Sequence, residues 1–168
     1  MRKLFSPKEY GFIGFFLGLP TVLYASMKNG KELEVSHPQI LRTAKMLLGF
    51  FAALVLLMIA LDVVNLLQIQ NTDNHYVGTQ MITRFSTYFS YISWGFLVIQ
   101  LILIVVLVAK TNKSELPIYN ELKQSGQLTH RSNAPLIGIG ILSWVVFWGY
   151  GFLIRILADY LAFGSILG

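Results

Sequence analysis

The sequence predicts an all-α integral membrane protein, a small helical bundle of three transmembrane helices with a short N-terminal membrane-inserted helix. Two observations predict this class. Of the 168 residues, 55% are hydrophobic and 12% are charged, whereas soluble domains carry about 25% charged residues. The apolar residues also fall in long runs, and a helix needs about 20 of them to cross the hydrocarbon core. We therefore expect a single membrane domain over residues 1–168.

The first apolar run, residues 11–27, contains no charged residue and has Lys and Arg on both sides. It is open to three interpretations: a re-entrant or interfacial helix, a fourth spanning helix, or a cleaved signal peptide. Pro20 removes a backbone donor within the run, and its glycines weaken a helix, so we prefer the re-entrant or interfacial helix. A signal peptide is least favoured, because the sequence has a poor cleavage site at Leu23-Tyr24-Ala25.

Three longer runs are predicted to be transmembrane helices, at residues 46–67, 91–109 and 135–154. The first contains one carboxylate, and the other two contain no charge. A transmembrane β-barrel is excluded because its strands alternate apolar and polar residues over about 10 positions, and these runs are apolar throughout.

The polar segments between these runs are short. Residues 110–134 are predicted to form a cytoplasmic loop. Within it, Pro117 suits a first helical turn, apolar residues 118 and 122 share a helix face, and Gly126 would end a short surface helix. Asn29-Gly30 is a dipeptide typical of turns.

The distribution of cations predicts the orientation. Short cytoplasmic loops are enriched in Lys and Arg. If residues 11–27 enter and leave on one side, eleven of the 13 Lys and Arg residues lie on that side, with Arg84 and Arg155 on the other. Four full spans would give at best eight and five. We therefore expect a multi-pass protein of the cell (plasma) membrane with a cytoplasmic N-terminus.

The N-terminal segment SPKEYGFIGFFLGLPTVLYASMKNGKEL resembles the start of a loose group of small bacterial multi-pass membrane proteins. The matching features are Ser6-Pro7, Phe15, Gly18, Pro20, Tyr24 and Asn29. Glu9 replaces the usual Gln, and Gly-Leu-Pro stands where Gly-Gly-Pro is typical. The resemblance covers about a fifth of the chain and implies a bacterial origin and an uncleaved N-terminus, but no activity.

Polar residues in the predicted spans are the candidate functional residues, because an ionisable group in hydrocarbon is costly. At about 1.5 Å per residue, Asp62 and Arg155 both come near the outer rim, where they can pair. Arg155 can also pair with Asp159 at i+4, and Asn65 lies one turn beyond Asp62. These groups either fix the helix register or form an outer gate or ion site, for which Gln100 would be the next polar step.

Glycines are the candidate helix-packing positions, because small residues let helix backbones approach closely. They are Gly14, Gly18, Gly138, Gly140, Gly149 and Gly151. We prefer a non-catalytic accessory or structural subunit that binds other membrane proteins, or itself as an oligomer, through these faces. The alternative is a small homo-oligomeric transporter or channel that uses Asp62, Gln100 and Arg155.

Several other functions are not expected. The chain has no cysteine, and its three histidines lack the spacing of a metal site, so we expect no metal, no cofactor and no enzymatic activity. The net charge of +5 comes from short clusters beside the spans. These clusters favour anionic lipid head groups over nucleic acid as the partner.

Overall fold

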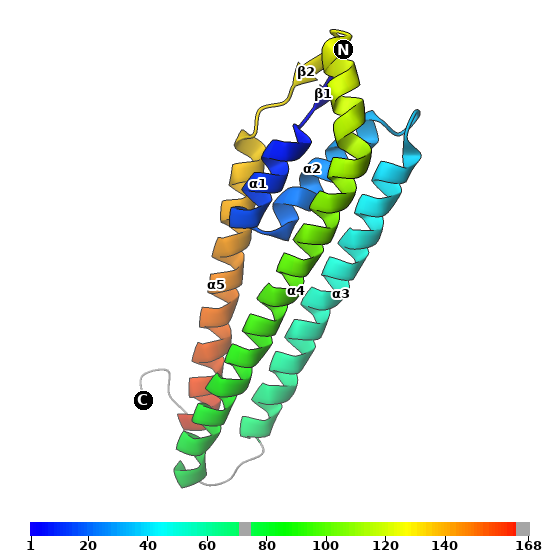
Figure 1. Cartoon of the computed structure of the whole chain (residues 1–168). Helices are drawn as coiled ribbons and strands as arrows, with labels where there is room; N and C mark the ends of the chain where they lie inside the picture. The colour runs from blue at the N-terminus through cyan, green and yellow to red at the C-terminus, as the bar shows by residue number, and fades with distance from the viewer. Residues whose placement is uncertain (71–74, 164–168) are drawn as a thin grey trace. The chain divides into compact units, whose positions relative to one another are not determined.

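The structure, a computed structural model, describes residues 1–70 and 75–163, except for the side chains of residues 70, 75–78 and 81. The described elements are β1 (Arg2–Leu4), α1 (Pro7–Leu17), α2 (Leu19–Glu32), α3 (Pro38–Gln70), α4 (His75–Gln124), β2 (Leu128–His130) and α5 (Ala134–Phe163). The protein is 86% helical (Figure 1), which confirms the all-α class.

Three helices, α3, α4 and α5, are long and apolar enough to cross a membrane. The predicted spans 46–67, 91–109 and 135–154 lie within them, and each helix extends beyond its apolar run. Many of their large apolar side chains face outward; Leu56 and Phe152, for example, are both 67% exposed. A large exposed apolar surface on long helices is the property of a protein solvated by lipid.

The chain, predicted to be a single membrane domain, divides into two compact units. The first unit comprises residues 1–51 and 99–144, and the second comprises residues 52–98 and 145–168. The boundaries fall within α3, α4 and α5. Eleven of the 13 Lys and Arg residues belong to the first unit, so the charge asymmetry expected from the sequence coincides with this division.

The N-terminal apolar segment is two short helices rather than the one predicted. The break between α1 and α2 is at Gly18, whose φ of 92° lies in the left-handed region that L side chains avoid. Pro20 follows in the first turn of α2, where its missing N–H costs no helical hydrogen bond. At 1.5 Å per residue the two helices are about 16 and 21 Å long, and each is shorter than the roughly 30 Å hydrocarbon core.

Both ends of the α1–α2 hairpin lie beside strand β2. Strand β1, which precedes α1, pairs with β2 in parallel, with Arg2 opposite Leu128 (Figure 1). Just beyond β2, Arg131 Nη2 donates to Glu32 Oε1 at the end of α2, at 3.3 Å. Arg2 Nη1 also donates to Ser36 Oγ at 3.1 Å. The chain therefore enters and leaves the hairpin at the same end of the first unit.

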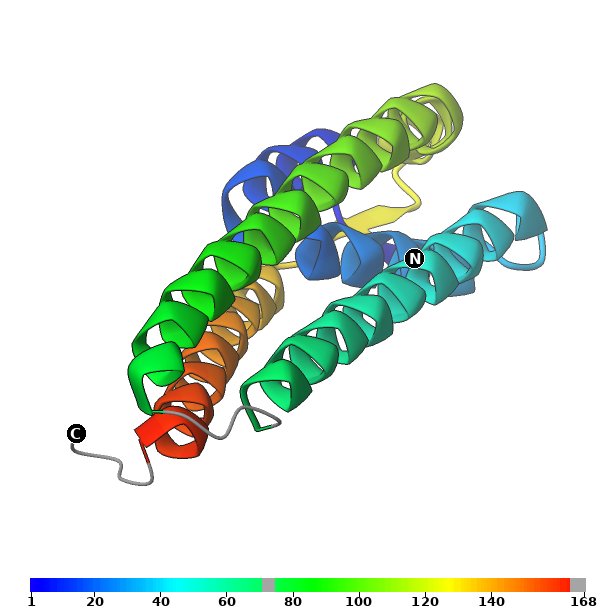
Figure 2. The same cartoon turned by 90° about the horizontal axis from the view of Figure 1, so that it is seen from below.

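The hairpin packs against the first-unit parts of the long helices. Its core residues Tyr10, Val22 and Leu23 form one cluster with Ile104 and Leu107 of α4, and both views show α1 and α2 beside α4 (Figures 1 and 2). The hairpin is therefore a packed part of the first unit and not a separate surface helix.

The predicted turn at Asn29-Gly30 is wrong, because both residues lie inside α2. A Cβ on Gly30 would come within 2.8 Å of Leu41 Cα, a backbone atom of α3. Asn29 is buried, and its side chain binds the backbone of Phe5. Close packing and a buried hydrogen-bonded amide thus keep this dipeptide helical.

The predicted loop at residues 110–134 is largely helical, since α4 continues through Pro117 to Gln124. Apolar residues 118, 119 and 122 of these last turns pack with Leu4, Leu33 and Ile40. The stop predicted at Gly126 is confirmed, because this residue follows the end of α4 with a φ of 70°. The helix that the residue pattern predicted is therefore the end of α4 and not a separate segment.

Candidate functional site

A cluster of buried polar side chains joins the hairpin to α4 in the first unit. Glu115 of α4 is 2% exposed. Its Oε2 accepts hydrogen bonds from Tyr10 Oη at 2.9 Å and Asn29 Nδ2 at 3.1 Å, and its Oε1 accepts one from Ser26 Oγ at 2.9 Å. We call these four residues the Glu115 cluster. One carboxylate thereby joins α1, α2 and α4.

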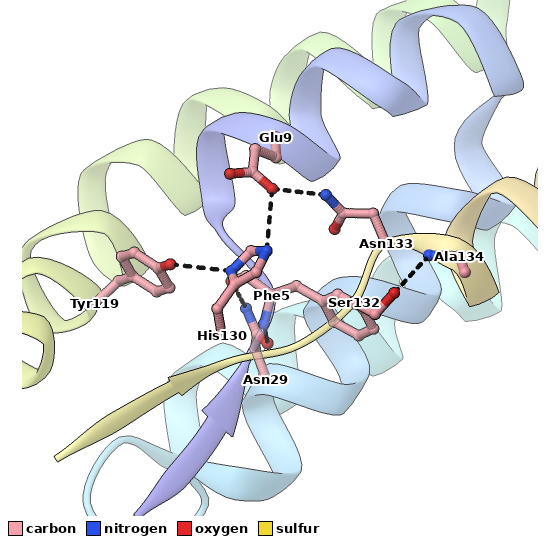
Figure 3. A network of polar contacts seen from close by, with 8 residues as sticks. All are labelled: Phe5, Glu9, Asn29, Tyr119, His130, Ser132, Asn133 and Ala134. Carbon is pink, nitrogen blue, oxygen red and sulfur yellow. Dashed lines mark hydrogen bonds and ion pairs between the residues drawn. The ribbon is translucent and has the colours of Figure 1, made fainter.

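Asn29 is oriented by the backbone of Phe5. The Phe5 N–H donates to Asn29 Oδ1 at 2.8 Å, and Asn29 Nδ2 donates to the Phe5 carbonyl at 3.0 Å (Figure 3). This pair of bonds determines which end of the amide is the donor. The Asn29 Nδ2 group must therefore donate to Glu115, which acts as the acceptor.

Tyr10 is completely buried in the same cluster. Burial, followed by the nearby negative charge of Glu115, raises the pKa of the Tyr10 phenol well above its usual range. The hydroxyl therefore keeps its proton and serves as a donor to the Glu115 carboxylate.

A pocket of about 550 Å³ opens beside the Glu115 cluster. Ser26 and Glu115 form part of its wall. Other polar residues on the wall are Ser36, His37, Gln39, Thr43, Lys110, Thr111, Lys113 and Ser114. Concave sites with a few convergent polar groups are the usual form of small-molecule sites, so this pocket is a candidate ligand site.

A second polar network connects β2 with α1 and α4 in the first unit (Figure 3). Asn133 Nδ2 donates to Glu9 Oε2 at 2.6 Å, and His130 Nε2 lies 3.5 Å from the same oxygen. The other ring nitrogen of His130 lies 3.4 Å from Tyr119 Oη. Because the side chains of His130 and Glu9 are about half exposed, water weakens their attraction. The network holds β2 against α1 and α4.

In the second unit, the predicted pairing of Asp62 with Arg155 is not formed. Asp62 is buried, and its Oδ2 accepts a hydrogen bond from Tyr150 Oη at 2.8 Å. Arg155 is exposed. The ion pairs between described residues are His130 with Glu9 and Arg131 with Glu32, so the Arg155–Asp159 pair is also not formed. Counting residues gave the depth of Arg155 along α5 but not the direction of its side chain.

The other two intramembrane candidates take structural positions. Asn65 is buried, and its Nδ2 donates to the Phe85 carbonyl at 3.3 Å. Gln100 belongs to the first unit, where its side chain lies beside Gly18.

At two of the predicted packing glycines, a side chain from a neighbouring element occupies the space beside the glycine. A Cβ on Gly14 would overlap the side chain of Val22, and one on Gly140 would overlap Leu17. A Cβ on Gly151 would make only ordinary contact, since its nearest atom would be a Phe89 ring carbon at 3.4 Å. Gly14 thus lets α1 pack closely against α2, and Gly140 lets α5 pack closely against α1.

The remaining predicted packing glycines are Gly18, Gly138 and Gly149. Gly18 forms the break in the hairpin. A Cβ on Gly138 or Gly149 would have no described atom within 4 Å. The surface notches beside Gly138 and Gly149 are therefore not filled by any described part of the chain.

Sequence reasoning missed the Glu115 cluster. One available signal was the spacing of Ser26 and Asn29, which are three residues apart and therefore share a helix face. Another was Glu115, a carboxylate six positions after the end of the apolar run 91–109. The cluster depends on a long-range contact, which neither signal reveals alone.

The fold and these sites define a small α-helical protein with three helices long and apolar enough to cross a membrane and with an N-terminal helical hairpin. The chain matches no protein family, no curated protein and no solved structure. The arguments for its function therefore rest on its own geometry.

Replacing Asn29 by Ala should lower the free energy of unfolding by about 3 kcal/mol, because the buried Phe5 backbone groups and Glu115 lose partners. The measurement is denaturant unfolding of the purified protein in detergent. Asn120→Ala, at an exposed position of the same protein, is the matched control and should have little effect. Equal stability of the two variants would contradict the role given to Asn29.

Replacing Tyr150 by Phe should lower the free energy of unfolding by about 1–3 kcal/mol, because buried Asp62 loses its hydrogen-bond donor. Arg155→Gln should leave stability nearly unchanged. The same unfolding measurement tests both variants. If Arg155→Gln proved the more damaging, Asp62 would depend on an ion pair and not on the tyrosine.

Proposed function

We propose that this chain is a non-catalytic, multi-pass membrane protein that acts as an accessory subunit and binds other membrane proteins through a glycine-containing face of α5. The observation that carries the proposal is the open notch at Gly149. The sequence places this glycine among bulky apolar residues, and a Cβ there would have no described atom within 4 Å.

The residues around the notch share one face of the second-unit part of α5. Val145, Gly149 and Phe152 are related by helical spacing i, i+4 and i+7. Val145 and Phe152 are both strongly exposed. A glycine between large side chains lets a second helix approach closely, and such van der Waals packing drives helix association in lipid. The α5 face therefore has the shape of a helix-binding surface.

The helix faces are the available recognition surface because the described connections are short. Residues 33–37 join α2 to α3, and residues 125–133 join α4 to α5 through β2. Neither connection has the length of a folded domain, which is typically 50 residues or more. Recognition of a partner by a packed helix face fits this architecture.

The orientation proposed is a cytoplasmic N-terminus in the plasma membrane of a bacterium. Support for it comes from the eleven Lys and Arg residues of the first unit, which follow the positive-inside rule. The hairpin supports it too, because it keeps the N-terminal cations on the same side as those after α2. The bacterial origin is supported by the N-terminal resemblance.

Copurification tests the accessory role. A tagged full chain, purified in mild detergent from its native membranes, should retain a stoichiometric membrane-protein partner that mass spectrometry identifies. Gly149→Leu should reduce the retained partner about tenfold, because an inserted side chain costs 1–3 kcal/mol of packing. The control is Gly95→Leu, at another glycine with no described atom within 4 Å of its Cβ position, and it should retain the partner.

Two results would contradict the proposal. One is purification of the wild-type chain without any membrane-protein partner. The other is equal loss of the partner in both leucine variants, which would remove the assignment to α5.

A further inference from the structure

The pocket beside the Glu115 cluster carries charges of both signs on one helix. Lys110 and Lys113 line it from α4, and so does Glu115. The lysines are exposed, whereas the acid is buried. A ligand that pairs with both kinds of charge must itself carry an anionic group and a cationic group.

The Glu115 carboxylate, whose residue lines the pocket, has unused acceptor capacity. Each carboxylate oxygen can accept two hydrogen bonds. Oε2 accepts two, but among described residues Oε1 accepts one, from Ser26, which also lines the pocket. One acceptor position of Oε1 is therefore not used by the described donors.

Glu115 also has no cationic partner among the described residues. The ion pairs in that part of the chain join His130 to Glu9 and Arg131 to Glu32. A buried carboxylate is stabilised by hydrogen bonds, of which Glu115 accepts three, and by an opposite charge, which the described residues do not supply. A primary ammonium supplies both the positive charge and the N–H donor that Oε1 can accept.

The basic residues of the pocket suit an anion. The two lysines on its wall provide positive charge and N–H donors. The first turn of α3 also lines the pocket through Gln39, so the positive end of that helix dipole adds to the field. A phosphate diester matches this combination of charge and donors.

The pocket adjoins the end of a predicted membrane span. Lys110 directly follows the apolar run 91–109 of α4, and basic residues just beyond a membrane span are positioned for phospholipid head groups. We propose that this pocket binds the phosphoethanolamine head group of a phospholipid, with the phosphate near Lys110 and Lys113 and the ammonium on Glu115 Oε1. This site is separate from the α5 face of the accessory role.

Lipid binding to the delipidated full chain tests the proposal. Phosphatidylethanolamine, phosphatidylcholine and phosphatidylglycerol with identical acyl chains are added in turn, and retained lipid is measured by native mass spectrometry. The choline group keeps the positive charge but lacks N–H donors, and glycerol lacks the charge. The ethanolamine lipid should bind about tenfold more tightly than either, as expected for one hydrogen bond between charged groups.

Two variants locate the site. Glu115→Gln should abolish the preference for the ethanolamine lipid over the choline lipid, whereas Glu121→Gln, at an exposed glutamate of α4, should keep it. A Lys110→Gln/Lys113→Gln double variant should weaken all three lipids alike. This rim variant tests the site even if Glu115→Gln does not fold.

Three results would overturn the proposal. Equal retention of the three lipids by the wild-type chain would exclude head-group recognition, and loss of the preference in Glu121→Gln would exclude Glu115 as its source. Displacement of the lipid by free phosphoethanolamine at equal concentration would assign the pocket to a soluble ester and overturn the lipid source.

Discussion

The buried carboxylate of Glu115 is the constraint on which the first unit depends. Buried carboxylates persist when hydrogen-bond donors surround them, and here the donors come from α1 and α2. Removing either helix from α4 would leave polar groups unsatisfied in an apolar core. Asn29 extends the same network to the backbone of Phe5, so the N-terminal strand is held by the same contact.

This constraint links the position of the hairpin to the distribution of charge. Because α1 and α2 turn back at Gly18, the cations before α1 and those after α2 lie at the same end of the first unit. Cations that short loops retain in the cytoplasm are thereby gathered on one side. The pocket beside the Glu115 cluster and the gathering of eleven Lys and Arg residues in the first unit are two consequences of the same geometry. The α5 face depends only on the exposed glycine.

The sequence was sufficient for the elements whose signal is local. Runs such as 91–109 predicted the three long helices, and Gly126 marked the end of α4. The sequence was not sufficient where a contact between distant residues determines the local structure. Asn29-Gly30 is a dipeptide typical of turns, but it is helical here because Leu41 packs against Gly30 and Phe5 binds the Asn29 side chain. For the same reason Asp62 was assigned to Arg155, although Tyr150 is its partner. The depth of a residue along a membrane helix follows from counting residues. The direction of its side chain depends on how the helices pack against one another.

Cysteine accessibility tests the central claim, that both ends of the hairpin lie on one face of the membrane. The chain contains no cysteine, so single cysteines at Lys3 and Val35, both exposed, report without interference. A membrane-impermeant thiol reagent is applied to sealed right-side-out and inverted vesicles. If both ends of the hairpin lie on the cytoplasmic face, both positions are labelled in inverted vesicles and neither in right-side-out ones. Labelling of the two positions from opposite sides would show instead that residues 11–27 cross the membrane.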